Sequence, residues 1–116
     1  MIAVIFEVWP AEGRKDDYLA IAKQLREDLV LVDGFISVER FQSLTDPDKL
    51  LSLSIFRDEA AVATWRNLHR HRSAQAEGRD GVFSNYRIRV ASILRDYGMT
   101  ERREQAPGDS QVRHGR

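Results

Sequence analysis

Residues 49–75, KLLSLSIFRDEAAVATWRNLHRHRSAQ, decide the fold. The run from Lys49 to Arg57 is mainly apolar and is typical of a β-strand. Asp58 then offers a side-chain cap, and Glu59 adds negative charge to a first helical turn, so both favour a helix start. The segment therefore predicts a strand followed directly by a helix that runs to Gln75 or a few residues beyond.

A second strand precedes this segment. Phe35 to Ser43 is also strand-like, and the four residues TDPD at 45–48 have the chemistry of a turn. Two strands joined by such a short connection form a hairpin. The sequence therefore predicts that residues 35–43 and 49–57 pair in an antiparallel arrangement.

Three further elements complete the pattern. Apolar residues at helical spacing indicate an amphipathic helix, and a glycine after its last turn favours a left-handed cap. The predicted elements are a strand at Ile2–Val8, a helix from Glu12 to the Asp33-Gly34 pair, and a last strand at Phe83–Asp96. The βαββαβ order predicts an α+β ferredoxin-like domain, with two helices on one face of an antiparallel sheet.

The other face of this sheet is unusually apolar. In an isolated domain that face meets water, yet Phe35, Ile36 and Val38 lie close together and the first strand is apolar on both sides. An exposed apolar surface of this kind favours association. A second copy of the same sheet is therefore predicted to cover it, giving a homodimer.

The composition fits one small domain of 116 residues. Basic and acidic residues number 18 each, which disfavours nucleic-acid binding, and the lack of cysteine excludes a thiol nucleophile or a thiolate metal site. Residues 1–98 are predicted to form the domain and 99–116 a polar tail that is flexible or contacts a partner. No stretch approaches the ~20 apolar residues of a membrane span, so a soluble, cytoplasmic protein is expected.

The element order and the quoted segment resemble the antibiotic biosynthesis monooxygenase (ABM) family of the dimeric α+β barrel superfamily. The likeness lies in LSLSIFRDEA at 51–60, in the helix tryptophan Trp65, and in HRHRSAQ at 69–75. The resemblance implies a homodimer whose two sheets form a barrel, with a pocket between sheet and helices in each subunit. Family members include cofactor-free oxygenases of phenolic polyketides, quinol oxygenases and heme-degrading oxygenases.

Helical geometry selects the candidate catalytic residues. At about 100° per residue, His69 and Arg72 lie on the same side of the helix as Trp65, whereas His71 points away and cannot share a metal with His69. We expect Trp65, His69 and Arg72 to be catalytic, with His69 as a base near neutral pH and Arg72 holding an anion. A purely structural role for Trp65 and His69 in the core is the alternative.

Further substrate-binding residues are predicted on the strands. Phe41 and Tyr86 would form an aromatic wall with Trp65, and Arg87 or Arg89 would hold the substrate anion. The resemblance implies such roles for an asparagine, the tryptophan and an arginine of the last strand, but no matching asparagine is evident here. The alternative for the two arginines is a salt bridge across the dimer, with Glu39 or Glu7.

Heme degradation is the least favoured activity. The heme-degrading relatives use a histidine ten residues after the tryptophan and an asparagine on the first strand. Here the tenth residue after Trp65 is Gln75, and the first strand contains no asparagine. Heme would have to bind through His69 or His71.

The sequence thus predicts a cofactor-independent monooxygenase, without metal or flavin, that oxidises a small phenol, quinol or polyketide-like substrate with O₂. The alternative is a non-catalytic dimeric protein that binds a small ligand or serves as an accessory subunit. A pocket of some hundreds of cubic ångströms lined by the predicted residues favours the enzyme. A collapsed pocket filled by Trp65 and Leu68 favours the alternative.

Overall fold

The computed structural model describes residues 1–77 and 81–109. In chain order the elements are β1 (Ile2–Pro10), α1 (Lys15–Leu29), β2 (Phe35–Gln42), β3 (Leu50–Phe56), α2 (Glu59–Glu77), β4 (Phe83–Ser92) and the 3₁₀ helix η1 (Arg103–Gln105). The predicted βαββαβ order is confirmed. Within the described ranges, no helix is long and apolar enough to cross a membrane.

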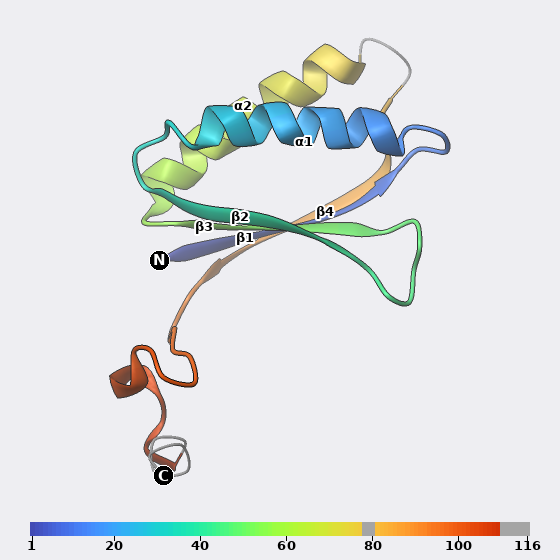
Figure 1. Ribbon diagram of the computed structural model, residues 1–116. Helices are drawn as coiled ribbons and strands as arrows, with labels where there is room; N and C mark the ends of the chain where they lie inside the picture. The colour runs from blue at the N-terminus through green and yellow to red at the C-terminus, as the bar shows by residue number, and fades with distance from the viewer. Residues whose placement is uncertain (78–80, 110–116) are drawn as a thin grey trace.

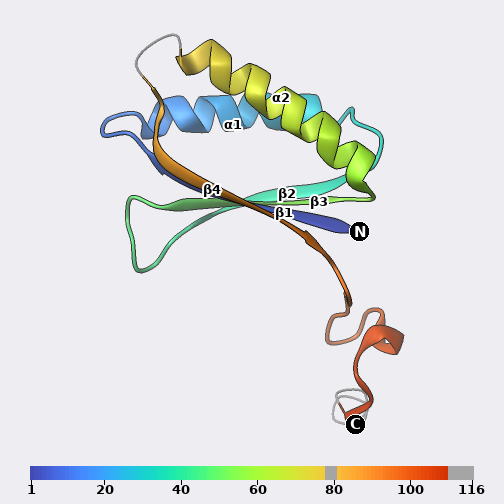
Figure 2. The same cartoon turned by 180° about the vertical axis from the view of Figure 1, so that it is seen from behind.

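The four strands form one sheet in the order β2-β3-β1-β4, and every neighbouring pair is antiparallel. Both helices cross the same face of this sheet (Figure 1). Seen from behind, α2 and β4 lie on the near side, whereas α1 lies closer to β2 (Figure 2). The predicted ferredoxin-like α+β fold is therefore confirmed.

The start of α2 forms as its sequence predicts. The carboxylate of Asp58 accepts a hydrogen bond from the backbone N–H of Ala61 at 3.0 Å, which satisfies one donor of the first turn. Three residues of this helix, Ala61, Val62 and Trp65, then pack against the core with Phe56 at the end of β3. The cap and the apolar face together fix how α2 leaves the sheet.

Two predicted boundaries were wrong. Helix α1 begins at Lys15, not Glu12, because Gly13 has a φ of 74° and the chain makes a tight turn there. It ends at Leu29, four residues before Asp33, where the backbone N–H of Val32 turns back to the Leu29 carbonyl at 2.9 Å.

The last strand is shorter than predicted, because it ends where its neighbour β1 begins. Strand β4 ends at Ser92, which pairs with Ile2 at the start of β1. One more backbone bond joins Ile93 to the Met1 carbonyl at 3.0 Å. Beyond that point β1 offers no partner, so the strand does not reach Asp96.

The register assigns every strand residue to one of two faces. The inner face, toward the helices, carries the row Arg40–Ser52–Phe6–Ile88 across all four strands. The outer face carries the row Glu39–Leu53–Ile5–Arg89. These two rows determine which side chains share a site, because neighbours across antiparallel strands point the same way.

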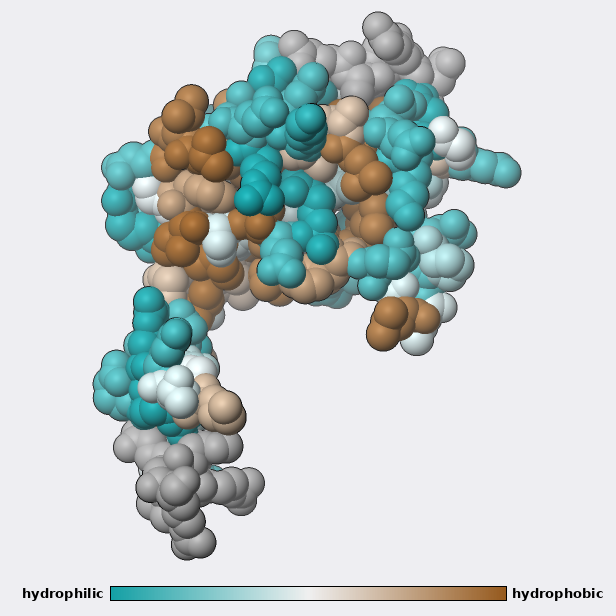
Figure 3. Space-filling view, in the orientation of Figure 1, coloured by the Kyte–Doolittle hydropathy of each residue, from teal (hydrophilic) through white to brown (hydrophobic). Residues whose placement is uncertain are grey.

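The outer face lacks a covering layer within the described residues. Half-buried Ile5, Leu51 and Leu53 lie along it, and Phe41 is 42% exposed. The space-filling view shows hydrophobic side chains on the surface of the domain among hydrophilic ones (Figure 3). Such an apolar face favours association, and its coverage by a second copy stays a prediction.

The C-terminal segment leaves the domain after β4 and extends away from it (Figure 1). Arg102 bonds to Asp96 at 2.9 Å, and the Arg103 guanidinium lies 5.1 Å from the Tyr97 ring centre. Residues 103–105 form a short 3₁₀ turn. The predicted tail boundary at residue 99 stays a prediction, and residues 110–116 lie outside the described residues.

Candidate functional site

A groove of about 400 Å³ lies between α2 and the edge strand β4. Helix α2 supplies one wall and β4 the other, and both walls combine apolar groups with polar ones. The lining residues are Val62, Trp65, Arg66, His69, Arg70, Ser73, Phe83, Tyr86, Ile88 and Val90. The groove is large enough for a small aromatic ligand.

Trp65 and His69 form the inner end of this groove. They lie one helical turn apart, so their rings stack on the same face of α2, with centroids 5.2 Å apart. The ring of Phe6, from β1, meets the His69 ring edge-on at 4.7 Å. Trp65 is only 4% exposed, so its ring is packed into the core. Tyr86 adds a fourth ring, 5.8 Å from Phe6.

His69 is neutral over most of the pH range. Burial lowers its pKa to about 4, and the positive charge of Arg40 acts in the same direction. At pH 7 a histidine with this pKa carries a proton on one ring nitrogen only. The other nitrogen accepts a hydrogen bond but is a weak base. The expectation that His69 titrates near neutral pH is therefore wrong for this fold.

A narrow slit of about 10 Å³ lies on the other side of Trp65 and His69, between the sheet and α1. It is lined by Phe6, Tyr18, Ile21, Ala22, Leu25, Arg40, Ser52, Trp65 and His69. Trp65 and His69 thus border both the groove and the slit. Arg40 was not among the predicted site residues, although its position two residues after the buried Val38 places it in phase with the core.

Arg72 does not join this site. Its guanidinium donates two hydrogen bonds to Asp28 of α1, at 2.8 Å and 2.9 Å. The pair raises the pKa of Arg72 and lowers that of Asp28. Arg72 therefore ties α1 to α2, and it lines neither the groove nor the slit.

The strand residues predicted to bind substrate fall on two different faces. Tyr86 is on the inner face and lines the groove. Phe41, Arg87 and Arg89 are on the outer face, since their partners across the sheet are outward-facing. The expected wall of Phe41 with Trp65 is therefore not formed within one chain, because the sheet lies between them.

Three charged side chains on the outer face, Glu7, Lys49 and Arg89, are paired with one another. Glu7 forms salt bridges with both Lys49 and Arg89 of its own chain. A hydrogen bond from Lys49 lowers the pKa of Glu7 most, and the bond from Arg89 adds to this. Arg89 therefore has an acidic partner within its own sheet, and the alternative of a salt bridge across a dimer stays a prediction.

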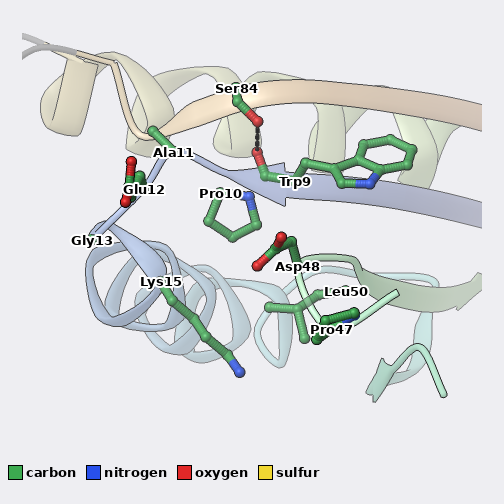
Figure 4. A pocket seen from close by; sticks show the side chains of 10 residues that line it. All are labelled: Trp9, Pro10, Ala11, Glu12, Gly13, Lys15, Pro47, Asp48, Leu50 and Ser84. Atoms are coloured by element: carbon green, nitrogen blue, oxygen red, sulfur yellow. Dashed lines mark hydrogen bonds between the residues drawn. The ribbon is translucent and has the colours of Figure 1, made fainter. Parts of the chain in front are cut away.

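A larger hollow of about 530 Å³ lies at the end of β1 near the β2–β3 hairpin (Figure 4). Its walls include Trp9, Lys15 and Asp48, and the Ser84 hydroxyl donates a hydrogen bond to the Trp9 carbonyl at 2.9 Å. The Trp9 indole N–H also bonds to Asp46 at 3.0 Å. None of the predicted site residues lines this hollow.

The described residues include no group of three or more histidine and acidic side chains that could hold a metal ion. His69, the histidine that borders both cavities, has the Arg40 cation as its charged neighbour. A nearby positive charge opposes the binding of a metal cation. These residues therefore do not fit a heme iron at His69.

Together these features define a ferredoxin-like α+β domain with an aromatic groove between its sheet and its second helix. A profile of the family "Antibiotic biosynthesis monooxygenase" (ABM) matches residues 1–77. The chain belongs to the ABM family.

One curated relative is the "Jasmonate monooxygenase ABM" of Pyricularia oryzae. It is 47% identical to this chain over 93 residues, which are 80% of this chain and 43% of the relative. The chain therefore spans less than half the length of the relative that it matches.

Solved structures share the fold. Rv0793 from Mycobacterium tuberculosis superposes with a TM-score of 0.71 at 17% identity, over 84% of this chain and 98% of that one. A mutant of SnoaB, a cofactor-independent oxygenase from Streptomyces nogalater, gives a TM-score of 0.67 at 4% identity, over 82% of this chain and 94% of that one. At these identities the likeness concerns the fold alone.

Proposed function

We propose that this ABM-family protein is a cofactor-independent monooxygenase that oxidises a small phenolic or quinol substrate in the α2–β4 groove. The observation that carries the proposal is the aromatic end formed by Trp65 and His69 on a groove of about 400 Å³. The curated relative named as a monooxygenase supports the reaction class. The substrate of that relative is named as jasmonate, which makes a small carboxylate a second substrate class to test.

The reaction balances without an added reductant. A phenol with a C–H group para to its hydroxyl reacts with one O₂, gains one oxygen atom at that carbon, and releases the other atom as water to give a quinone. The substrate supplies all four electrons. The ionised ring passes the first electron to O₂, so the protein has to bind the ring, stabilise its anion and exclude bulk water.

Three side chains have direct roles in this proposal. Trp65 and Tyr86 hold the ring by aromatic contact, since both border the groove. His69 is neutral and presents a ring nitrogen that accepts a hydrogen bond from the substrate. Arg72 acts as a positioning residue, because its bonds to Asp28 hold α2, and hence Trp65, against α1.

We also propose that the protein acts as a homodimer. The uncovered apolar outer face supports this, and a second sheet would bury it. Light scattering with size-exclusion chromatography tests the assembly, and a monomer at micromolar concentration contradicts it.

The slit favours a second candidate function. At about 10 Å³ it is nearly closed, and Leu68 packs with Trp65 against the core. A non-catalytic ligand-binding or accessory protein would have such a closed interior. The oxygenase remains favoured because the adjoining groove is open and lined by the same tryptophan and histidine.

Oxygen uptake tests the proposal. Purified protein is incubated with dihydroxynaphthalenes, anthrones, hydroquinones and jasmonate, and O₂ consumption is recorded with an electrode. We expect uptake with at least one ring compound, a loss of about tenfold or more in Trp65→Phe or His69→Ala, and no change in His71→Ala, an exposed histidine on the same helix. Ligand binding without uptake in the wild type would favour the second candidate.

A further inference from the structure

Arg40 is an inward-pointing arginine on the strand β2. It lies opposite Ser52 of β3, which in turn lies opposite Phe6 of β1, so its side chain enters the layer between the sheet and α1. One guanidinium nitrogen, Nη2, donates a hydrogen bond to the backbone carbonyl of Ala22 at 3.2 Å. The arginine is therefore held in place by the helix above it.

The charge of Arg40 is not balanced. Arg57, Arg72 and Arg89 each form an ion pair with a carboxylate. No ion pair within the described residues includes Arg40. Its Nε–H is buried and has no hydrogen-bond acceptor within the described part of the chain. The Arg40 side chain as a whole is half-buried. A buried N–H of a cation without an acceptor is costly, and an anionic ligand would offset that cost.

The slit beside Arg40 is lined with groups that suit an oxygen atom. Its volume of about 10 Å³ is close to that occupied by a single water-sized group. The Tyr18 hydroxyl lies beside the guanidinium, since burial raises the pKa of Tyr18 while the charge and a hydrogen bond of Arg40 act against that rise. Ser52 and His69 complete the polar lining.

We propose that Arg40 is an oxyanion-binding residue, which pairs with an ionised oxygen of the substrate while the substrate's ring remains in the α2–β4 groove. This inference rests on the proposed function and extends it. Trp65 and His69 line both the slit and the groove. Binding of the oxygen by Arg40 therefore requires the His69 ring to turn aside, so that the hydrogen bond it accepts from the un-ionised substrate is replaced by the bond from Arg40 once the oxygen is ionised. The substrate's O–H bond breaks, its proton leaves to water, and the oxyanion accepts a hydrogen bond from the Arg40 Nε–H.

This assignment solves a problem that His69 leaves open. A base with a pKa of about 4 does not retain the proton of a phenol at neutral pH. The site must therefore lower the pKa of the phenol itself. A cation within a few ångströms lowers such a pKa by about one to three pH units. Arg87 and Arg89 cannot serve within the same chain, since they lie on the other face of the sheet.

Anaerobic binding of 4-nitrophenol tests the inference, because the absorbance of this probe separates phenol from phenolate. We expect wild-type protein to lower the pKa of the bound probe by about one or more, and Arg40→Gln to abolish this with at least a tenfold loss of phenolate affinity. Arg40→Lys should keep part of the effect, and the exposed Arg26→Gln on α1 all of it. Benzoate against benzyl alcohol tests a carboxylate as the source of the oxyanion.

Three outcomes overturn the inference: wild-type protein binds neither anion, a folded Arg40→Gln binds them as tightly as the wild type, or Arg87→Gln loses the binding instead. Circular dichroism and thermal melting establish that each variant is folded. If Arg40→Gln does not fold, the Arg40→Lys comparison decides. Arg40-dependent anion binding without oxygen uptake contradicts the proposed function alone, whereas uptake that Arg40→Gln leaves unchanged contradicts the oxyanion site alone.

Discussion

Arg40 and Arg89 stand on the same four-stranded sheet, on opposite faces, and their charges are handled differently. On the outer face, Arg89 and Lys49 share the carboxylate of Glu7. On the inner face, Arg40 bonds to the Ala22 carbonyl and the Tyr18 hydroxyl, and its Nε–H has no acceptor. On the outer face, Lys49 and Arg89 therefore have a carboxylate partner within the chain, whereas the inner cation has none, so the presence of arginine alone does not locate an anion site.

The aromatic residues of the two faces provide the largest test of this comparison. Trp65→Ala should lower the free energy of unfolding by about 3–5 kcal/mol, because Trp65 is buried in the core. Phe41→Ala, on the outer face, should cost about 1 kcal/mol or less in the monomer. Urea denaturation measures both. Equal losses of unfolding free energy in the two variants would mean that Phe41 is buried. If the urea midpoint also depended on protein concentration, a dimer interface would be the cause of that burial.

The two histidines of α2 provide the next test. The pKa of His69 in the folded chain, about 4, lies below the value of about 6.5 in the unfolded chain, so between these values the unfolded state binds more protons. Stability should therefore fall by roughly 2–3 kcal/mol as the pH drops from 6.5 to 4. His69→Gln should remove this loss and His71→Gln should keep it, as measured by urea unfolding at each pH.

The two arginines give the smallest expected effects, and these differ in sign. Arg40→Met should leave the stability unchanged or raise it by about 1 kcal/mol, because it replaces a half-buried charge that lacks a carboxylate partner with an apolar chain. Arg89→Met should lower it by about 1 kcal/mol or less, since an exposed salt bridge is lost. Thermal melting compares them. A large loss in Arg40→Met would show that the inner cation is structural.

The fold was predictable because each element carries a strong local signal. Alternation along β4 correctly assigned Tyr86 and Ile88 to one face and Arg87 and Arg89 to the other. The cap at Asp58 correctly predicted that α2 begins at the next residue, Glu59. Helical spacing likewise brought Trp65 and His69 to the same side of α2, where their rings are in contact.

The site was less predictable, because it depends on contacts between elements. Arg72 lies near Trp65 on the helix surface, but Asp28 of the neighbouring helix binds it. Which residues of β2 face inward could not be predicted from the sequence either. Strict alternation from Phe35 would place Phe41 on the inner face, whereas a bulge between Phe35 and Ser37 reverses the phase and turns Arg40 inward instead.

Because of that bulge, the two ends of β2 respond differently to insertions and deletions. A change of one residue is tolerated at the start of the strand but not at its end. The extra residue, Ile36, is taken up where the strand begins, so its deletion leaves the pairs Ser37–Ile55 and Arg40–Ser52 in register. A one-residue insertion in the 43–48 turn would instead slide the strand along its partner and exchange Arg40 for a neighbour. Across relatives, gaps near residue 36 are therefore compatible with an unchanged site, and gaps in the hairpin turn mark a changed one.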